Sequence, residues 1–290
     1  MEIEMEKKEN LFLVQDKSNY FFSIEEACIQ PIIMKGANLY IRKICEILKI
    51  AIPEKFLNHQ LYNGDNVIFT DAAFHIGTIK ACIKYYGKEH CYLYYLNTIN
   101  DLNIKFCKYF LSKNIYTFDY MDAQNYGLKY KHTPYSNKLT LLKTKIEYDV
   151  LFLGREKGRE EKIYEIYLSL KSRGFRTKFL VLGSSNKEFK LEKYLDYQEY
   201  LSLCAKSKSI VEINKIGQYG CSLRMLESLF FEKKLITNNL GVYKDDYYNS
   251  NNIFVWGSDD INRIADFIDS PYIADKDLTQ LMFQNWVKSF

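Results

Sequence analysis

The sequence predicts an α/β protein made of two domains, each with a parallel sheet that helices cover on both faces. A chain of 290 residues is longer than most single domains. Short apolar runs alternate with helical patterns along most of it, as in parallel sheets. A polar stretch over residues 126–145, with Pro134 and no clear period, separates two such series. We therefore expect domains over residues 1–138 and 139–270.

The N-terminal half shows the alternation more weakly. Strands are expected at residues 67–70, 91–96 and 115–118, with helices at 74–86 and 102–112 between them. The first 60 residues offer candidate strands at 11–14 and 20–22 and an amphipathic helix at 37–48. This half is expected to be α/β as well.

The C-terminal half shows the alternation clearly. Residues 148–153 form an apolar run ending at Gly154, and apolar residues then recur at 163, 166, 167 and 170, which is helical spacing. Gly174 stands where a helix C-terminus is expected. Further strands are expected at 178–182, 209–213, 234–237 and 252–256, with helices at 197–207, at 222–231 and from 260. This pattern predicts a Rossmann-like domain.

The composition narrows the class of protein. Hydrophobic residues at 47% and charged residues at 26% predict a folded globular core. A net charge of +4 fits a phosphorylated ligand or an anionic membrane surface, and no basic block resembles a nucleic-acid arm. The seven cysteines include no C-x-x-C pair, which predicts free thiols and no zinc site. With no secretory signal and no apolar run of membrane-spanning length, a cytoplasmic location is expected.

The turn after residues 148–153 is the first candidate binding site. It carries two glycines and three cations: Gly154, Arg155, Lys157, Gly158 and Arg159. Cations are unfavourable at a helix N-terminus, so their position suggests a bound diphosphate, although they also fit a solvated helix start. Gly183, which ends the next strand, belongs to the same predicted sheet edge.

The loop and helix over residues 217–227 form the second candidate. Gly217 and Gly220 free the backbone to approach a ligand, and Ser222 is a plausible N-cap. Arg224 and Glu227 lie three apart on one helical face, where they can pair with each other. Near the strand ends they can instead bind phosphate and the hydroxyls of a ribose.

These segments carry a resemblance to a known family. YDVLFLGREKGR, YQEYL and SIVEINKIGQYGCSLRMLESLFFEKKLITNN resemble the donor domain of bacterial GT-B glycosyltransferases from capsule and lipopolysaccharide loci. The resemblance implies that two Rossmann-like domains face each other across a cleft and that residues 271–290 form a helix packing back on the N-terminal domain. It also implies that Gly154, Arg155, Lys157 and Gly158 bind the donor diphosphate and Glu227 the ribose. Tyr219 stands where many retaining members have a first glutamate.

An inverting transfer needs a general base on the acceptor side. Asp71 follows the strand at 67–70, with His75 one helical turn on, and Asp119 follows the strand at 115–118. Asp71 also fits a helix cap and His75 an ordinary helix-face histidine. All three are retained as candidate catalytic residues.

The sequence thus predicts a glycosyltransferase that moves a sugar from a nucleotide-sugar, by default a UDP-sugar, to a saccharide or lipid-linked saccharide acceptor. No metal and no cofactor are expected, since cations and helix N-termini can neutralise the diphosphate. A peripheral contact with the inner face of the membrane is kept open, as is the oligomeric state. The alternatives are a non-catalytic nucleotide- or glycan-binding partner of another transferase and, third, a nucleotide-sugar epimerase or hydrolase of related fold.

Overall fold

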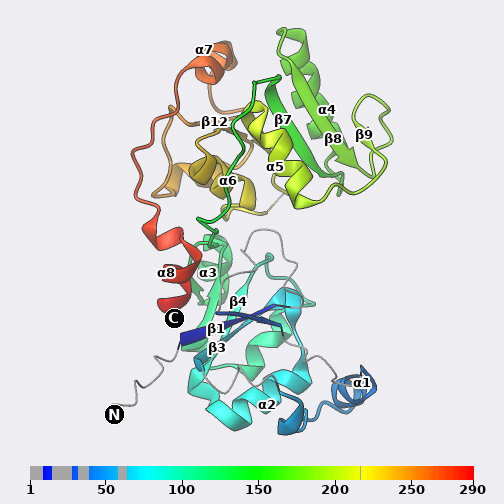
Figure 1. Cartoon of the computed structure of the whole chain (residues 1–290), viewed down its shortest axis with the longest axis vertical. Helices are drawn as coiled ribbons and strands as arrows, with labels where there is room; N and C mark the ends of the chain where they lie inside the picture. The colour runs from blue at the N-terminus through cyan, green and yellow to red at the C-terminus, as the bar shows by residue number, and fades with distance from the viewer. Residues whose placement is uncertain (1–8, 15–27, 32–38, 58–63, 216) are drawn as a thin grey trace. The chain divides into compact units, whose positions relative to one another are not determined.

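The computed structural model describes residues 9–14, 28–31, 39–57, 64–215 and 217–290. The chain divides into two compact units. Unit 1 consists of Met1–Ser136 and Thr279–Phe290, and unit 2 of Asn137–Leu278. Each is built on a six-stranded parallel sheet with helices between the strands (Figure 1). The predicted α/β class with two Rossmann-like sheets is confirmed.

The sheet of unit 1 has the strand order β2-β1-β3-β4-β5-β6. Its strands are β1 Glu9–Val14, β2 Ile29–Pro31, β3 Gly64–Thr70, β4 Cys91–Tyr95, β5 Ile115–Thr117 and β6 Lys129–Tyr130. Its helices are α1 Leu39–Leu48, α2 Ile76–Tyr86, α3 Tyr120–Tyr126 and, from the end of the chain, α8 Phe283–Lys288. Short 3-10 helices occupy Glu54–Phe56, Asp71–Ala73, Lys88–His90, Ile104–Tyr109, Ser112–Asn114 and Thr279–Leu281. The expected strand at 20–22 and the start of the helix at 37–48 lie outside the described residues.

One helix predicted in unit 1 is wrong. In place of an α-helix over 102–112, the chain forms the 3-10 helix Ile104–Tyr109. The Asn103 carbonyl, which an α-helix would commit to an amide four residues on, accepts from the Tyr95 hydroxyl at 2.9 Å and from the Phe106 amide at 3.0 Å. Phe106 stacks on Phe74 with ring centroids 3.6 Å apart. Tertiary contacts of these side chains override the helical spacing.

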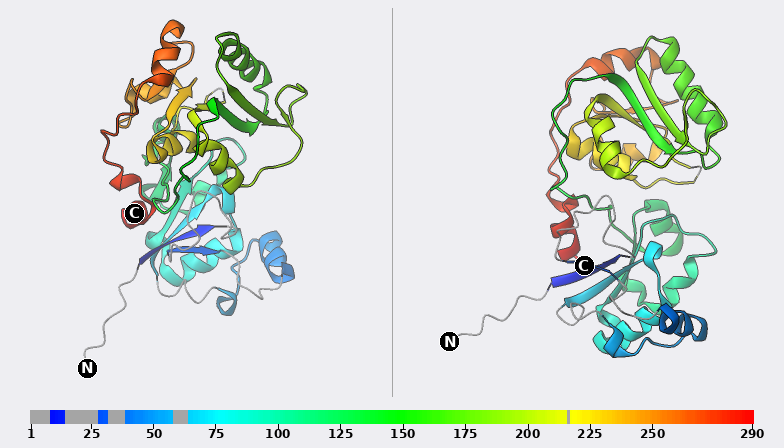
Figure 2. Two further views of the ribbon diagram at one scale, coloured as in Figure 1. Left: turned by 45° about the horizontal axis from the view of Figure 1, so that its top comes forward. Right: turned by 45° about the vertical axis from the view of Figure 1, so that its right-hand side comes forward.

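The sheet of unit 1 buries both faces. Leu11, Val67, Phe69 and Leu93 point to one face and pack with α2. Alternate residues point to the other face, where α8 supplies Phe283, Trp286 and Val287 against Phe12, Ile68 and Tyr94. Figure 2 shows α8, in red, beside β1, in blue. The last helix of the chain is thus part of the core of unit 1.

The sheet of unit 2 has the strand order β12-β11-β10-β7-β8-β9. The strands are β7 Tyr148–Arg155, β8 Thr177–Leu182, β9 Lys190–Leu191, β10 Ser207–Glu212, β11 Lys234–Thr237 and β12 Ile253–Val255. The helices are α4 Glu160–Ser172, α5 Tyr197–Ala205, α6 Leu223–Phe231 and α7 Ile264–Asp269, with 3-10 helices at Leu240–Lys244 and Ile261–Arg263. The predicted strands and helices of this half are confirmed within a few residues, and Gly174, at φ +83°, follows the end of α4.

The two faces of this sheet are covered by different helices. Side chains of α4 and α7 pack on the face formed by Val150, Phe152 and Val211. Helices α5 and α6 contact β10 and also reach β7 and β11. The helix after β7 and the helix after β10 therefore lie on opposite faces, although the two strands are neighbours. Such a switch point opens a crevice at the carboxyl ends of the strands.

The structure also tests the expectations about the cysteines and about a membrane-spanning helix. The seven cysteines, all within the described ranges, are free thiols, as predicted. Across the described ranges, no helix combines the length and apolar character needed to cross a membrane.

Candidate functional site

Unit 2 has a pocket of about 240 Å³ at the switch point between β7 and β10. It is lined by Phe152, Leu153, Gly154, Arg159, Val211, Glu212, Ile213, Asn214, Gln218, Ser222, Leu223 and Arg224. Of the predicted donor-binding residues, Gly154, Ser222 and Arg224 line it directly. Its volume falls below the roughly 300–1,000 Å³ of sites that enclose a whole ligand, so it suits part of a larger molecule.

Arg159 forms the cationic wall of the pocket next to α4. Its guanidinium donates to the carbonyls of Ile213 and of Arg155, the latter at 2.7 Å. Burial is the main cause that lowers its pKa below the ordinary value; the charge of Glu156 opposes this, and the charge of Arg224 adds to it. Three backbone carbonyls, including that of Glu156, accept from this cation and hold it in place.

The turn after β7 adds further cations beside Arg159. Lys157 and Gly158 have positive φ angles of 45° and 73°, and the Gly158 amide donates to the Glu156 carboxylate at 2.8 Å. Partial burial lowers the pKa of Lys157, and repulsion from Lys215, Arg159 and Arg155 lowers it further. These four cations are close enough to affect the pKa of Lys157, so they form one positive cluster. We call Arg155, Lys157, Arg159 and Lys215 the cation cluster.

Lys215 was missed by sequence reasoning. It comes from the loop after β10, whereas the other three cations come from the end of β7 and the turn that follows it. The signal was a lysine three residues beyond the end of a parallel strand, at the edge where the neighbouring strand also ends.

Glu212 is the second residue that sequence reasoning missed. It ends β10, is 3% exposed, lines the pocket, and accepts hydrogen bonds from the Ser222 and Thr237 hydroxyls. Burial raises its pKa above the ordinary value, while those two hydrogen bonds and the charge of Arg224 act against the rise. A carboxylate directly after the apolar pair Ile210 and Val211, at the end of a strand, was the available signal.

Glu227 is fully buried behind the pocket and does not line it. Its carboxylate accepts from the Tyr197 hydroxyl at 2.8 Å, the Tyr200 hydroxyl at 2.6 Å and Arg224 at 2.5 Å. Arg224 also donates to the Leu153 carbonyl at 3.0 Å and lies over the Tyr200 ring, 4.0 Å from its centroid. The ribose contact expected of Glu227 stays a prediction; the contacts in the structure are those by which Glu227 holds Arg224 in the pocket wall.

The contacts of Arg224 with Glu227 and Tyr200 determine whether its side chain is charged. Burial disfavours its charged form, yet Glu227 and the neighbouring tyrosines raise the pKa of the guanidinium above its ordinary value. The guanidinium is therefore a cation at neutral pH.

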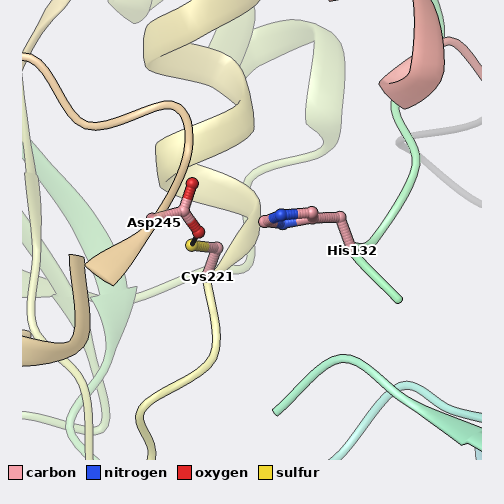
Figure 3. Close-up of side chains that lie close together, drawn as sticks. All are labelled: His132, Cys221 and Asp245. Carbon is pink, nitrogen blue, oxygen red and sulfur yellow. Dashed lines mark hydrogen bonds between the residues drawn. The ribbon is translucent and has the colours of Figure 1, made fainter. Parts of the chain in front are cut away.

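The glycine loop is anchored at its ends. Ser222 caps α6 by accepting from the Arg224 amide at 3.1 Å, as predicted from its position. The Cys221 thiol donates to the Asp245 carboxylate over 2.7 Å (Figure 3). Gly217, at φ +84°, and the buried Gly220 flank Gln218, which lines the pocket. Gly183, also at φ +84°, turns the chain after β8 and does not line this pocket.

Asp71 lies at the carboxyl end of β3 in unit 1. Its oxygens accept from the Leu96 amide at 2.7 Å and the Asn97 side chain at 2.9 Å, both at the end of β4. It does not cap α2, whose N-cap position is His75. Burial raises the pKa of Asp71, and the hydrogen bonds from Asn97 and Leu96 partly oppose this. Asp71 therefore stays a candidate general base.

The other two candidate bases have structural partners. His75 contacts Arg42 through both ring nitrogens and lies 3.8 Å from Glu46, both on α1. Burial and then Arg42 lower the pKa of His75, which leaves the imidazole neutral. Asp119 is fully buried and caps α3 by accepting from the Met121 amide at 2.9 Å and the Asp122 amide at 3.3 Å. The structure thus explains Asp119 as a helix cap.

Comparisons with known proteins assign no family to this chain. No family model matches the chain, and no curated protein does. Among solved structures, a Listeria monocytogenes protein provisionally assigned as a UDP-N-acetylglucosamine 2-epimerase is 12% identical, with a TM-score of 0.43. The match covers 87% of this chain and 81% of that one. At this level of similarity, the activity of the Listeria protein says nothing about this chain.

Proposed function

We propose that the chain is a glycosyltransferase of the GT-B class, and that the pocket of unit 2 binds the nucleoside diphosphate part of a nucleotide-sugar. The observation that carries the proposal is the cation cluster beside a pocket at the switch point of a parallel sheet. Ligands of open parallel sheets bind at such points. Lys157 is repelled by the other three cations, and a bound diphosphate would offset that repulsion.

The cation cluster also suits the chemistry of transfer. When the bond between the anomeric carbon and the diphosphate oxygen breaks, negative charge builds up on the leaving group. Arg155, Lys157 and Lys215 are exposed and Arg159 is held by carbonyls, so all are placed to stabilise that charge. Binding would relieve the repulsion that lowers the pKa of Lys157.

The polar groups of the pocket suit the nucleoside. Glu212 offers two buried oxygens, each of which accepts one hydroxyl and has a further lone pair. We assign to Glu212 the ribose contact that the sequence placed at Glu227, with Asn214 and Gln218 beside it. Uridine diphosphate is the first ligand to test.

Asp71 is the proposed general base in unit 1. It would take the proton of the acceptor hydroxyl as that oxygen bonds to the anomeric carbon, and the nucleoside diphosphate would leave with the electron pair of the broken bond. Its raised pKa brings its basicity closer to neutral pH. The acceptor is proposed to be a saccharide or lipid-linked saccharide in bacterial surface polysaccharide synthesis, which rests on the sequence resemblance.

A thermal-shift series tests the pocket. We expect UDP, or one of GDP, CMP and ADP, to raise the melting temperature, because it binds the folded state. The double variant Lys157→Ala with Lys215→Ala should weaken binding about tenfold. Its matched control is Lys162→Ala with Lys190→Ala, which removes two lysines of unit 2 that pair with Glu165 and Glu192. If none of the four nucleotides raises the melting temperature of the protein, the proposal is refuted.

A non-catalytic nucleotide- or glycan-binding partner is the second candidate. It is favoured by the structural partners of His75 and Asp119, which leave Asp71 as the remaining base among the three predicted. Transfer of sugar from the nucleotide-sugar that binds, followed by mass spectrometry of an acceptor mixture, would exclude it.

A further inference from the structure

Helix α1 of unit 1 presents its apolar side outward. It lies beside α2 at the outer side of the unit (Figure 1). Its charged residues Arg42 and Glu46 turn inward, where they contact His75 of α2. The outward side carries large apolar side chains, and Ile50 lies two residues beyond the end of the helix. The exposed fractions are 75% for Tyr40, 52% for Ile44, 69% for Ile47, 60% for Leu48 and 49% for Ile50. We call these five side chains the α1 apolar face.

This orientation reverses what packing alone favours. A surface helix normally buries its apolar stripe and exposes its charges. Here Cys45 is 3% exposed and Ile41 is half-buried, while the larger side chains of Tyr40, Ile44, Ile47 and Leu48 are each more than half exposed. A contiguous exposed apolar patch of this kind marks an interaction surface.

Cations flank the α1 apolar face. Lys43 and Lys49 are exposed, and Lys80 of α2 donates to the Lys49 carbonyl at the end of α1. Glu46, the acidic residue of α1, accepts from the Gly77 amide at 3.4 Å on the inner side. Apolar side chains bordered by lysines match the boundary between anionic headgroups and acyl chains.

We propose that the α1 apolar face binds an anionic lipid membrane, with α1 lying in the plane of the interface. A second copy of the chain fits less well, because a two-fold contact would bring the flanking lysines of both copies together. Five partly exposed side chains also offer only a few hundred Å², against about 800 Å² per partner in a stable interface. The inference concerns unit 1 and is independent of the pocket in unit 2.

Vesicle sedimentation of the full chain tests this inference. Vesicles of phosphatidylcholine with phosphatidylglycerol should bind the protein, and pure phosphatidylcholine should bind it less. The variant Ile44→Glu with Ile47→Glu should reduce partitioning into anionic vesicles by about tenfold or more. The matched control is Leu102→Glu, since Leu102 is 75% exposed on unit 1 and lies outside α1. Lys43→Glu with Lys49→Glu should remove the preference for anionic lipid.

The outcomes separate the possibilities. Vesicle binding that disappears in the α1 variant and persists in Leu102→Glu supports the inference. Absence of binding by the parent protein overturns it, as does equal binding by the α1 variant. If a second copy of the chain covers the α1 apolar face, light scattering will show self-association, and that result also overturns the membrane inference. The nucleotide-dependent thermal shift should be the same in every variant, so failure here is distinguishable from failure of the proposed function.

Discussion

Replacing Glu227 with alanine distinguishes a structural role from a ligand contact. The side chain is fully buried and holds the Tyr197 and Tyr200 hydroxyls and Arg224. Removing it leaves the Arg224 guanidinium, on a side chain 22% exposed at the pocket wall, without its carboxylate, and breaking one partner of a fully buried ion pair costs about 3–5 kcal/mol, which is the upper value here. We therefore expect Glu227→Ala to destabilise unit 2 by up to that amount, a reversal of the sequence-based expectation that the variant only weakens donor binding.

The assay should report on unit 2 alone, because two-state analysis does not hold across two units. Cys204 serves this purpose: it is buried, and its thiol lies 3.8 Å from the Tyr200 hydroxyl. Burial raises the pKa of the Cys204 thiol to about 12, so it reacts slowly while folded. Pulsed alkylation across a urea series, read by mass spectrometry at Cys204, gives the unfolding midpoint of this region.

A double variant supplies the control. Arg224→Met with Glu227→Leu removes both charges together, so its loss of stability should be well below the sum of the two single variants. If Glu227→Ala keeps the parent urea midpoint while nucleotide binding disappears, the buried network is not structural and the ribose assignment returns to Glu227.

Four further predictions concern other residues. Arg176 is the main cause that lowers the pKa of Asp149 to about 2, so the stability lost in Asp149→Asn should be complete above about pH 4 and vanish as pH falls towards 2, which urea midpoints across that range would measure. Burial lowers the pKa of Lys131 to about 8 from 10.5, so the stability of the parent protein relative to that of Lys131→Met should rise with pH between these values, which paired urea midpoints would measure. Trp286→Ala should cost unit 1 about 3–5 kcal/mol, measured by urea unfolding with alkylation of its buried cysteines. Asp71→Asn should lower sugar transfer about 100-fold or more while the nucleotide-dependent thermal shift is kept, and an unchanged rate would remove Asp71 as the base.

The sheets were predictable because their strands are short apolar runs with regular spacing. Strands β7, β10 and β11 are each four to eight residues long and largely buried, and β8 alternates buried with half-buried residues in its second half, so their sequence carries the signal. The edge strands β6 and β9 have two residues each, too few for any period. The helix expected at 102–112 failed because Tyr95 and Phe74, far along the chain, set the local backbone.

The site was predictable as a sheet edge but not in its individual contacts. Both segments chosen from the sequence reach the pocket, through Gly154 and Arg159 in one case and Ser222 and Arg224 in the other. Which of two carboxylates faces the ligand depends on how α6 is rotated against β10, and no local pattern encodes that. Tertiary packing turns Glu227 inward and leaves Glu212 at the pocket wall.

The place of α8 has a consequence for how the chain matures during synthesis. Unit 1 begins the chain, but Phe283, Trp286 and Val287, which cover one face of its sheet, are translated only after all of unit 2. Domains commonly fold in the order in which they leave the ribosome. Here the first unit to be made is the last to be completed. Its uncovered sheet face, with Phe12, Ile68 and Tyr94, is what a chaperone would encounter on the nascent chain.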